Sequence, residues 1–156
     1  MRHWLMKSEP SDSSIDDLQQ AGSLPWTGVR SHQARNFMRD DMLVGDGVLF
    51  YHSSCPEPGI AGLARVSRAP YPDATQFDPD SRYFDARSAR ENPRWVHVDV
   101  SFVAKTALLS LADMRAAPEL AEMLVLRRGN RLSITPVQPT EWRVILERLG
   151  ALWPSD

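Results

Sequence analysis

Cysteine is nearly absent from this 156-residue sequence, which contains Cys55 alone. A single cysteine excludes an internal disulfide framework and a multi-cysteine zinc site. No apolar run approaches the length of a membrane span, and the first residues, MRHWLMKSEP, lack the layout of a secretory signal. The glycine patterns of phosphate loops and dinucleotide-binding turns are missing as well. We therefore expect one cytoplasmic domain with no membrane contact, no cofactor and no metal ion.

Lysine is the second scarce residue. Only Lys7 and Lys105 are lysines among the 18 basic residues, so the other sixteen are arginines. The planar fork of arginine suits phosphates and base edges, although a GC-rich coding sequence would give the same bias. The net charge of −2 excludes a basic field over the whole protein, so only local patches are expected. Contacts with a nucleic-acid backbone are predicted for Arg35, Arg39, Arg94, Arg127 and Arg128.

The hydrophobic patterning predicts an α+β domain around a small, curved, mostly antiparallel sheet of five or six strands flanked by short helices. Strands are expected at 3–7, 48–51, 60–66, 95–105 and 132–135. Helices are expected at 14–18, 110–113, 118–126 and 139–149, and another begins near residue 31. The run VLFY at 48–51 is apolar throughout, which indicates a strand buried on both faces. The long segment 70–92 contains several prolines and aromatics, and a loop of this length is usually functional.

The stretch 26–39, WTGVRSHQARNFMR, combines an aromatic plate with a polar helix face. At helical spacing one side of the helix is apolar, and it consists of Ala34, Phe37 and Met38. The opposite side can donate many hydrogen bonds, and it consists of His32, Arg35, Asn36 and Arg39. Beside Trp26, this face suits a flat, polar, anionic ligand such as a nucleotide. The alternative is a solvated helix face beside a core tryptophan.

Small polar residues follow two of the expected strands. Lys7, Ser8 and Glu9 end the first strand, and His52 and Ser53 end the strand 48–51. Such groups can donate to and accept from the edge of a base. A glutamate carboxylate only accepts, so Glu9 suits the exocyclic amine or the ring N–H of a base. A surface ion pair between Lys7 and Glu9 is the alternative.

Catalytic arrangements are weak by comparison. Cys55 with His52 would need a third group to orient the base, and none is evident. The dipeptide of His52 and Ser53 says nothing about convergence in space. His97 and Asp99 share one face of the strand 95–105, but no third metal ligand accompanies them. We therefore predict no catalytic residues.

Several separated motifs together resemble the EVE domain, a member of the PUA-like superfamily that is related to YTH domains. They cover nearly the whole chain and read WLMKSEP, WTGVRSHQARNFMR, VGDGVLFYHS, PGIAGLA, YPDATQFDP, ENPRWVHVDVSFV, LVLRRGNRLSITPV and EWRVIL. The resemblance implies a barrel-like sheet of five or six strands with a pocket for a nucleobase. YTH domains hold N6-methyladenine of RNA in an aromatic cage. EVE domains are linked to modified bases in DNA, such as 5-methylcytosine and its oxidised forms.

The resemblance also implies roles for matched positions. Trp26 is similar to a cage tryptophan, and Thr27 to the backbone donor beside it. The predicted ligand-binding set is Lys7, Ser8, Glu9, Trp26, Thr27, Arg30, Gln33, Asn36, Tyr51, His52 and Ser53. The long loop has no tryptophan for the second wall of a cage. That wall is therefore expected from Tyr71, Phe77, Tyr83 or Phe84.

The function predicted from the sequence is non-enzymatic binding of a modified base in DNA or RNA, flipped out and stacked on Trp26. A nucleotide- or RNA-acting enzyme of the PUA-like superfamily is the first alternative. A protein-interaction module that uses its arginine-rich helix is the second. The sequence leaves open the modification, the choice between DNA and RNA, and the oligomeric state.

Overall fold

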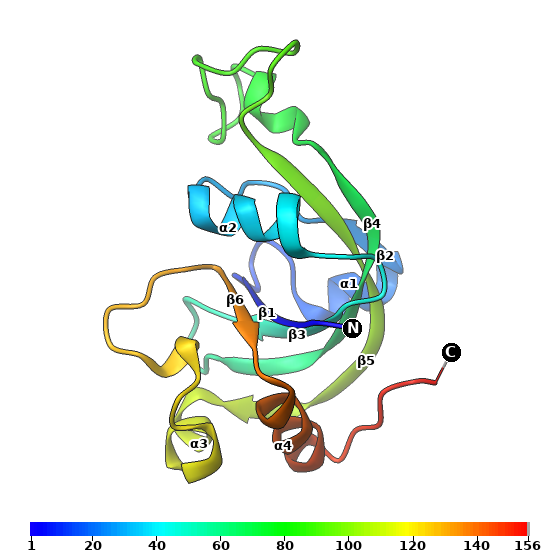
Figure 1. Cartoon of the computed structure of the whole chain (residues 1–156), viewed down its shortest axis with the longest axis vertical. Helices are drawn as coiled ribbons and strands as arrows, with labels where there is room; N and C mark the ends of the chain where they lie inside the picture. Colours follow the sequence, from blue (N-terminus) through cyan, green and yellow to red (C-terminus); the bar gives the residue numbers. More distant parts are fainter. Residues whose placement is uncertain (156) are drawn as a thin grey trace.

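Six strands form one curved sheet in the computed structural model, which describes residues 1–155 (Figure 1). The strand order is β2-β5-β4-β3-β1-β6. Only β1 and β3 are parallel, and every other neighbouring pair is antiparallel. The strands are β1 (His3–Ser8), β2 (Ser23–Pro25), β3 (Gly47–His52), β4 (Gly59–Pro72), β5 (Val96–Ser110) and β6 (Ile134–Val137). The predicted fold class, α+β with a mostly antiparallel sheet, is confirmed.

The central strands are buried on both faces, as the run VLFY predicts. Alternate side chains of β3 enter two separate hydrophobic clusters, Phe50 in the first and Leu49 in the second. Strand β1 divides in the same way, with Met6 in the first cluster and Leu5 in the second. A period of two therefore gives this sheet a core on each side. The first core includes Trp26.

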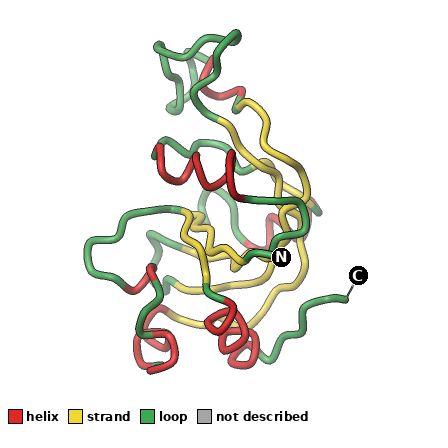
Figure 2. The backbone as a smooth tube through the Cα atoms, viewed as in Figure 1, coloured by secondary structure: helices red, strands yellow, loops and turns green. Residues whose placement is uncertain are grey.

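Helices cover both cores (Figure 2). The first core is covered by α1 (Ile15–Ala21), which Ser14 begins with a capping box, and by α2 (His32–Asn36). A π-helical turn, η1 (Phe37–Asp41), continues α2, so the predicted apolar side buries Ala34 and Met38. The second core is covered by α3 (Leu111–Ala116) and α4 (Pro139–Leu149).

The helix predicted at 118–126 is wrong. Two 3₁₀ turns, η3 (Pro118–Leu120) and η4 (Leu124–Leu126), occupy this segment, and Met123 between them is extended. The buried residues Ala117, Leu120 and Met123 recur every three positions. That spacing matches the three residues per turn of a 3₁₀ helix rather than the 3.6 of an α-helix.

Strands β4 and β5 are much longer than predicted, and their far ends form an arm that extends from the sheet in Figure 1. Their pairing continues through several register shifts as far as the pair Pro72 and Val96. The tip of the arm is the loop 73–95, which includes the short 3₁₀ turn η2 (Ala74–Phe77). The last strand was predicted to close before Pro136 but includes it. Because β6 is an edge strand, the missing N–H of a proline is tolerated there.

Candidate functional site

A pocket of about 660 Å³ lies where the end of β1, the turn after β3 and the segment after β2 meet the loop 73–95. This volume is within the usual range for small-molecule sites. Seven of the eleven predicted ligand-binding residues line it, namely Lys7, Ser8, Glu9, Trp26, Thr27, Arg30 and Ser53. The remaining lining residues are Asp12, Ser13, Leu24, Pro25, Gly28, Val29, Ser54, Arg82, Tyr83, Arg131 and Ser133.

Trp26 forms one wall of this pocket. Its side chain is 8% exposed, and its ring meets the edge of Phe50 with 5.6 Å between the ring centres. The backbone N–H of Trp26 donates to the carbonyl of Val98 at 2.9 Å, which joins the segment to β5. The indole is therefore anchored in the first core and still borders the opening.

Tyr83 supplies a second aromatic ring to the pocket, and it is the only one of the four predicted candidates to do so. The ring packs directly on Gly28. A Cβ atom at this glycine would come within 2.6 Å of the tyrosine Cζ, and its φ of +85° also favours glycine. Tyr71 instead donates to Asp99 at 2.6 Å, and Phe77 packs under the guanidinium of Arg90.

Several polar groups of the pocket have no partner within residues 1–155. The Glu9 carboxylate makes no hydrogen bond or ion pair there, although Glu9 is exposed at the rim. The unpaired hydroxyls belong to Ser13, Thr27, Ser53, Ser54 and Ser133. The hydroxyl of Ser8 differs, because it donates to the carbonyl of Ser13 at 2.6 Å. The pocket thus presents an acceptor carboxylate and several free hydroxyls.

Cations outnumber acids around the pocket. Lys7 and Arg131 contribute positive charge, and neither has an ion-pair partner within the described chain. Burial lowers the pKa of Lys7. Arg82 donates to Asp12 at 2.9 Å and to the hydroxyl of Tyr83, so this pair links the two sides of the rim. An anionic ligand therefore meets a positively charged edge.

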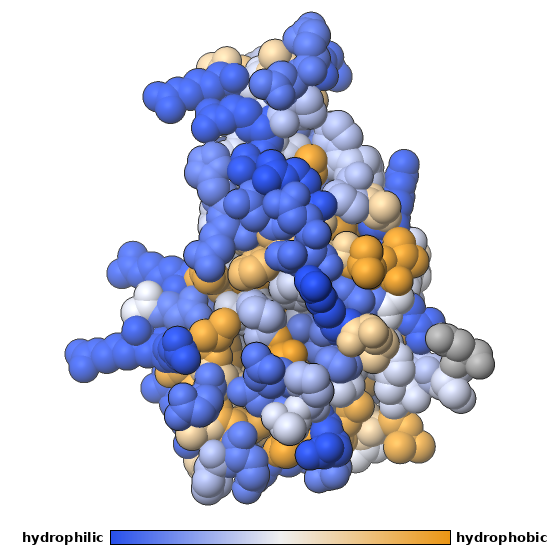
Figure 3. All heavy atoms as spheres, viewed as in Figure 1, coloured by the Kyte–Doolittle hydropathy of each residue, from blue (hydrophilic) through white to orange (hydrophobic). Residues whose placement is uncertain are grey.

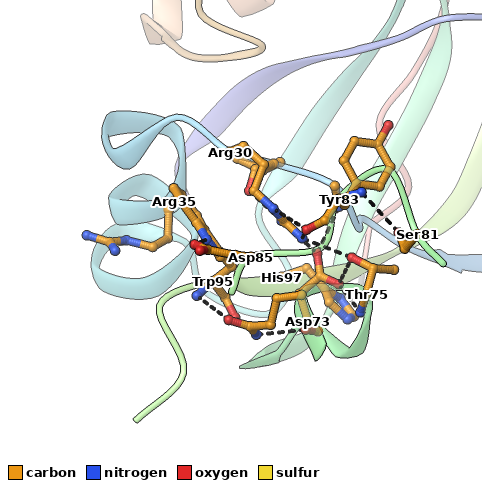
Figure 4. Close-up of polar contacts among 12 residues, drawn as sticks. Arg30, Arg35, Asp73, Thr75, Ser81, Tyr83, Asp85, Trp95 and His97 are labelled. Carbon is orange, nitrogen blue, oxygen red and sulfur yellow. Dashed lines mark hydrogen bonds and ion pairs between the residues drawn. The ribbon is translucent and has the colours of Figure 1, made fainter. Parts of the chain in front are cut away.

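Arg30 lines the pocket, but its guanidinium is occupied by the protein (Figure 4). It donates to the carbonyl of Tyr83 at 3.0 and 2.7 Å, to the Thr75 hydroxyl at 3.0 Å and to the Asp73 carboxylate at 3.2 Å. A further bond goes to the carbonyl of Val29. The geometry therefore gives Arg30 the role of fixing the loop that carries Tyr83.

Asp73 and Gln76 complete this anchoring of the loop, and both are fully buried. Burial alone would raise the pKa of Asp73, but hydrogen bonds from Thr75, Gly28 and Arg30 outweigh it and lower the pKa. The amide of Gln76 donates to the carbonyls of Asp73 and Trp95, each at 2.7 Å. The arm is thus tied to the body of the protein by satisfied polar groups.

Four predicted ligand-binding residues lie elsewhere. Gln33 is exposed on α2, and the side chain of Asn36 accepts hydrogen bonds from Arg35. Tyr51 is buried in the second core, because it follows Phe50 on β3 and therefore points to the opposite face of the sheet. His52 accepts from the backbone N–H of Ile15 at 3.1 Å, at the start of α1. None of the four lines this pocket.

The arginines predicted to contact a nucleic-acid backbone fall into two groups. Arg35 and Arg94 pack around the ring of Trp95, where Arg35 donates to the carbonyl of Arg94 and Arg94 pairs with Asp85 at 3.2 Å. Arg39 pairs with its neighbour Asp40. Arg127 and Arg128 are exposed in the turn before β6, and they have no partner among residues 1–155.

Among residues 1–155 the structure adds no third ligand to the candidate metal-binding pair. His97 is buried with its Nδ1 3.6 Å from Asp99, and these two residues have no third metal-binding side chain. Across residues 1–155 no group of three such side chains gathers. Burial lowers the pKa of His52, whose Nε2 already accepts from Ile15. No helix in this part of the chain has the length and apolar character needed to cross a membrane.

Some lining residues were missed from sequence. Tyr83 was one of four open alternatives, whereas Arg82 and Arg131 were not among the predicted site residues. Gly28 was the available signal, because a glycine beside Trp26 permits the close approach of another ring. Nothing local in the sequence indicates that the turn at 127–133 folds back toward the end of β1.

The curved six-stranded sheet, with a pocket at its strand ends, defines a domain of the PUA-like class. The EVE domain model matches residues 2–148, and the chain therefore belongs to the EVE domain family. It is 40% identical to human thymocyte nuclear protein 1 over 163 residues, which cover 92% of this chain and 72% of the human protein.

Solved structures agree with this assignment. A crystal structure of a Pseudomonas putida protein superimposes with a TM-score of 0.90 at 48% identity, covering 93% of this chain and 97% of that one. The crystal structure of human thymocyte nuclear protein 1 in complex with DNA containing 5-methylcytosine has a TM-score of 0.88 at 39% identity. It covers 95% of this chain and 97% of the human one.

Proposed function

We propose that this protein binds DNA carrying a modified cytosine, and that the extruded base enters the pocket lined by Trp26 and Tyr83. The human relative in complex with DNA containing 5-methylcytosine is the observation that carries the proposal. The pocket supports it, since two aromatic rings, an unpaired carboxylate and a basic rim suit a flat base attached to a phosphate chain.

Stacking alone does not account for binding. Extruding a base costs a few kcal/mol, and each stacked base returns about 1–3 kcal/mol. These terms nearly cancel, so polar contacts must supply the surplus. In this proposal the Glu9 carboxylate accepts from the exocyclic amine of cytosine, a contact that contributes about 1–3 kcal/mol of discrimination against a base without that donor.

The modification itself adds less. Burying one methyl group contributes about 0.8 kcal/mol, which corresponds to roughly a fourfold preference. We therefore expect strong selection for cytosine and a modest preference for its methylated form. Lys7, Arg82 and Arg131 would contact phosphates around the pocket, which makes the affinity fall as the salt concentration rises.

The test is a titration of DNA carrying one 5-methylcytosine, cytosine or thymine at the same position, at a fixed salt concentration. Wild-type protein should prefer 5-methylcytosine, then cytosine, then thymine. Glu9→Gln keeps the shape of the side chain but replaces a carboxylate, which only accepts hydrogen bonds, by an amide with one accepting oxygen and one donating NH₂ group. It should weaken binding to 5-methylcytosine about tenfold. The matched control is Glu147→Gln on α4, which should bind as wild type does.

Two results would contradict the proposal. One is equal affinity for the three DNAs, and the other is unchanged binding by Glu9→Gln. Mass spectrometry of the recovered DNA separates binding from turnover. An unaltered oligonucleotide agrees with a binding protein, and a chemically changed base would favour the enzyme alternative.

A further inference from the structure

Phe84 is an exposed aromatic residue next in the sequence to a residue that lines the pocket. It is 43% exposed and directly follows Tyr83, whose ring lines the pocket. Within residues 1–155 the other large apolar side chains with comparable exposure are Met1, Leu43, Val44, Leu108 and Leu152. None of these is aromatic, and none belongs to the loop 73–95. A single exposed apolar residue needs no explanation by itself, but the backbone around Phe84 holds it in a defined position.

The backbone on both sides of Phe84 is fixed. The carbonyl of Tyr83 accepts two hydrogen bonds from Arg30, at 3.0 and 2.7 Å. On the other side, the carboxylate of Asp85 accepts from the indole N–H of Trp95 at 2.7 Å, as Figure 4 shows for this region. The N–H of Phe84 donates to the carbonyl of Ser81 at 3.1 Å, which closes a turn. The ring is therefore exposed on an ordered loop, and its exposure is not the result of a loose segment.

Phe84 lies on a polar loop with charges of both signs. Arg82, Arg87 and Arg90 are exposed on this loop, as are Asp78, Asp80 and Glu91, and the tip of the arm is covered mainly by hydrophilic side chains in Figure 3. An apolar ring presented alone on a polar surface has the form of the side chains that some DNA-binding proteins insert between base steps. The residue before Phe84 is Tyr83, whose ring lines the pocket, so one turn of the chain carries both rings.

We propose that Phe84 enters the base stack of a DNA duplex, in the gap left by the base that occupies the pocket. The DNA that this protein binds is therefore double-stranded. This inference rests on the proposed function, because it needs a base in the pocket. Removing a base from a duplex leaves a gap and an unpaired partner, and an aromatic ring can restore the lost stacking. In single-stranded DNA no such gap forms, so Phe84 has nothing to replace there.

The experiment compares Phe84→Ala, Phe84→Leu and wild type on the same 5-methylcytosine sequence in double-stranded and single-stranded form. Phe84→Ala should bind the duplex about tenfold more weakly and the single strand as wild type does. Phe84→Leu keeps an apolar wedge and should recover most of the duplex affinity. The control Leu152→Ala removes a more exposed apolar side chain, 91% exposed, and should leave both affinities unchanged.

The outcomes separate the two proposals. If wild type prefers the methylated duplex and Phe84→Ala binds that duplex as tightly as wild type does, insertion of Phe84 is contradicted. The proposal that a modified base binds in the pocket is then unaffected. Equal losses on duplex and single strand would also contradict insertion of Phe84, because they would indicate a general contact. If wild type shows no preference for modified DNA in either form, the proposed function is contradicted, and the role of Phe84 that depends on it is contradicted as well.

Discussion

Trp26 and Trp95 show how the same side chain serves two different ends in this protein. Both indoles are largely buried, at 8% and 4% exposure; arginines pack on the ring of Trp95, and arginines line the pocket that Trp26 borders. Around Trp95 the polar groups are satisfied: its N–H donates to Asp85, and His32 stacks on its ring. Beside Trp26 a cavity opens, and the Glu9 carboxylate and most of the hydroxyls that line it are unpaired within residues 1–155.

The pocket beside Trp26 is therefore distinguished by polar groups that have no partner within residues 1–155. Arginines occur in both regions and distinguish neither. Arg30 illustrates the point, because it borders the pocket but uses its donors on Tyr83, Thr75 and Asp73. Groups that are already paired hold the walls in place, and the groups left free can bind a ligand.

The largest effect should come from removing the guanidinium that joins the two regions. Arg30→Met leaves the fully buried Asp73 carboxylate without its ion pair, and should lower the free energy of unfolding by about 3–5 kcal/mol. Urea denaturation measures this. The control is Arg82→Met, which breaks the exposed pair with Asp12 and should cost far less, because water screens exposed ion pairs. Similar losses for the two variants would show that Arg30 does not anchor the loop.

A smaller effect should distinguish the two tryptophans directly. Trp95→Phe removes the donor to the Asp85 carboxylate, whereas Trp26→Phe removes no side-chain hydrogen bond within residues 1–155. Both lose similar volume, so Trp95→Phe should be less stable than Trp26→Phe by about 1–3 kcal/mol. In DNA titrations the order reverses, and Trp26→Phe should bind more weakly. Thermal unfolding measures the stability of the two variants, and DNA titration measures their affinity. If the same variant is the weaker one in both assays, the two tryptophans do not differ in role.

The smallest effect concerns His52, which the structure assigns to scaffolding. Burial lowers its pKa, and in the folded protein Nε2 accepts a hydrogen bond from the backbone N–H of Ile15. The unfolded chain takes up a proton near its ordinary value of about 6.5, and the folded chain does so only at lower pH. The stability from this group is therefore complete above that value and declines as the pH falls below it.

The glutamine of His52→Gln does not titrate, so comparison with this variant isolates the contribution of His52 to the pH dependence of stability. The stability of wild type relative to His52→Gln should decrease when the pH is lowered from about 7.5 to about 5.5. Melting temperatures at several pH values measure it. DNA affinity of the variant should match wild type, since His52 does not line the pocket. A difference in stability between wild type and His52→Gln that does not change with pH would contradict this role of His52. A loss of DNA affinity in the folded variant would indicate that His52 takes part in binding.

Much of the fold could be predicted because its strands are apolar and its helices are capped. The strand at 48–51 and the capping box begun by Ser14 are local patterns, and both were confirmed. The arm was not predicted, because SRAPYP at 67–72 is polar and contains two prolines. Its strand structure comes from pairing with β5 through register shifts, and a local pattern does not show long-range pairing.

The site was predicted in part for the same reason. Lys7 and Ser8 end β1, Glu9 and Ser53 directly follow β1 and β3, and the pairing of these two strands places their ends together. Tyr51 was misplaced because it belongs to a strand buried on both faces, where one position of sequence changes the side of the sheet. Arg131 and Arg82 approach the pocket from distant segments, which only tertiary structure brings there.

Gly28 has a consequence for variation at this site. Because the tyrosine ring lies against its backbone, the separation of the two aromatic walls depends on an atom that is missing. Even an alanine at this position would displace the ring of Tyr83, whose carbonyl Arg30 holds, and would change the separation of the two rings. The width of the pocket is thus governed by a residue that contributes no side chain to it.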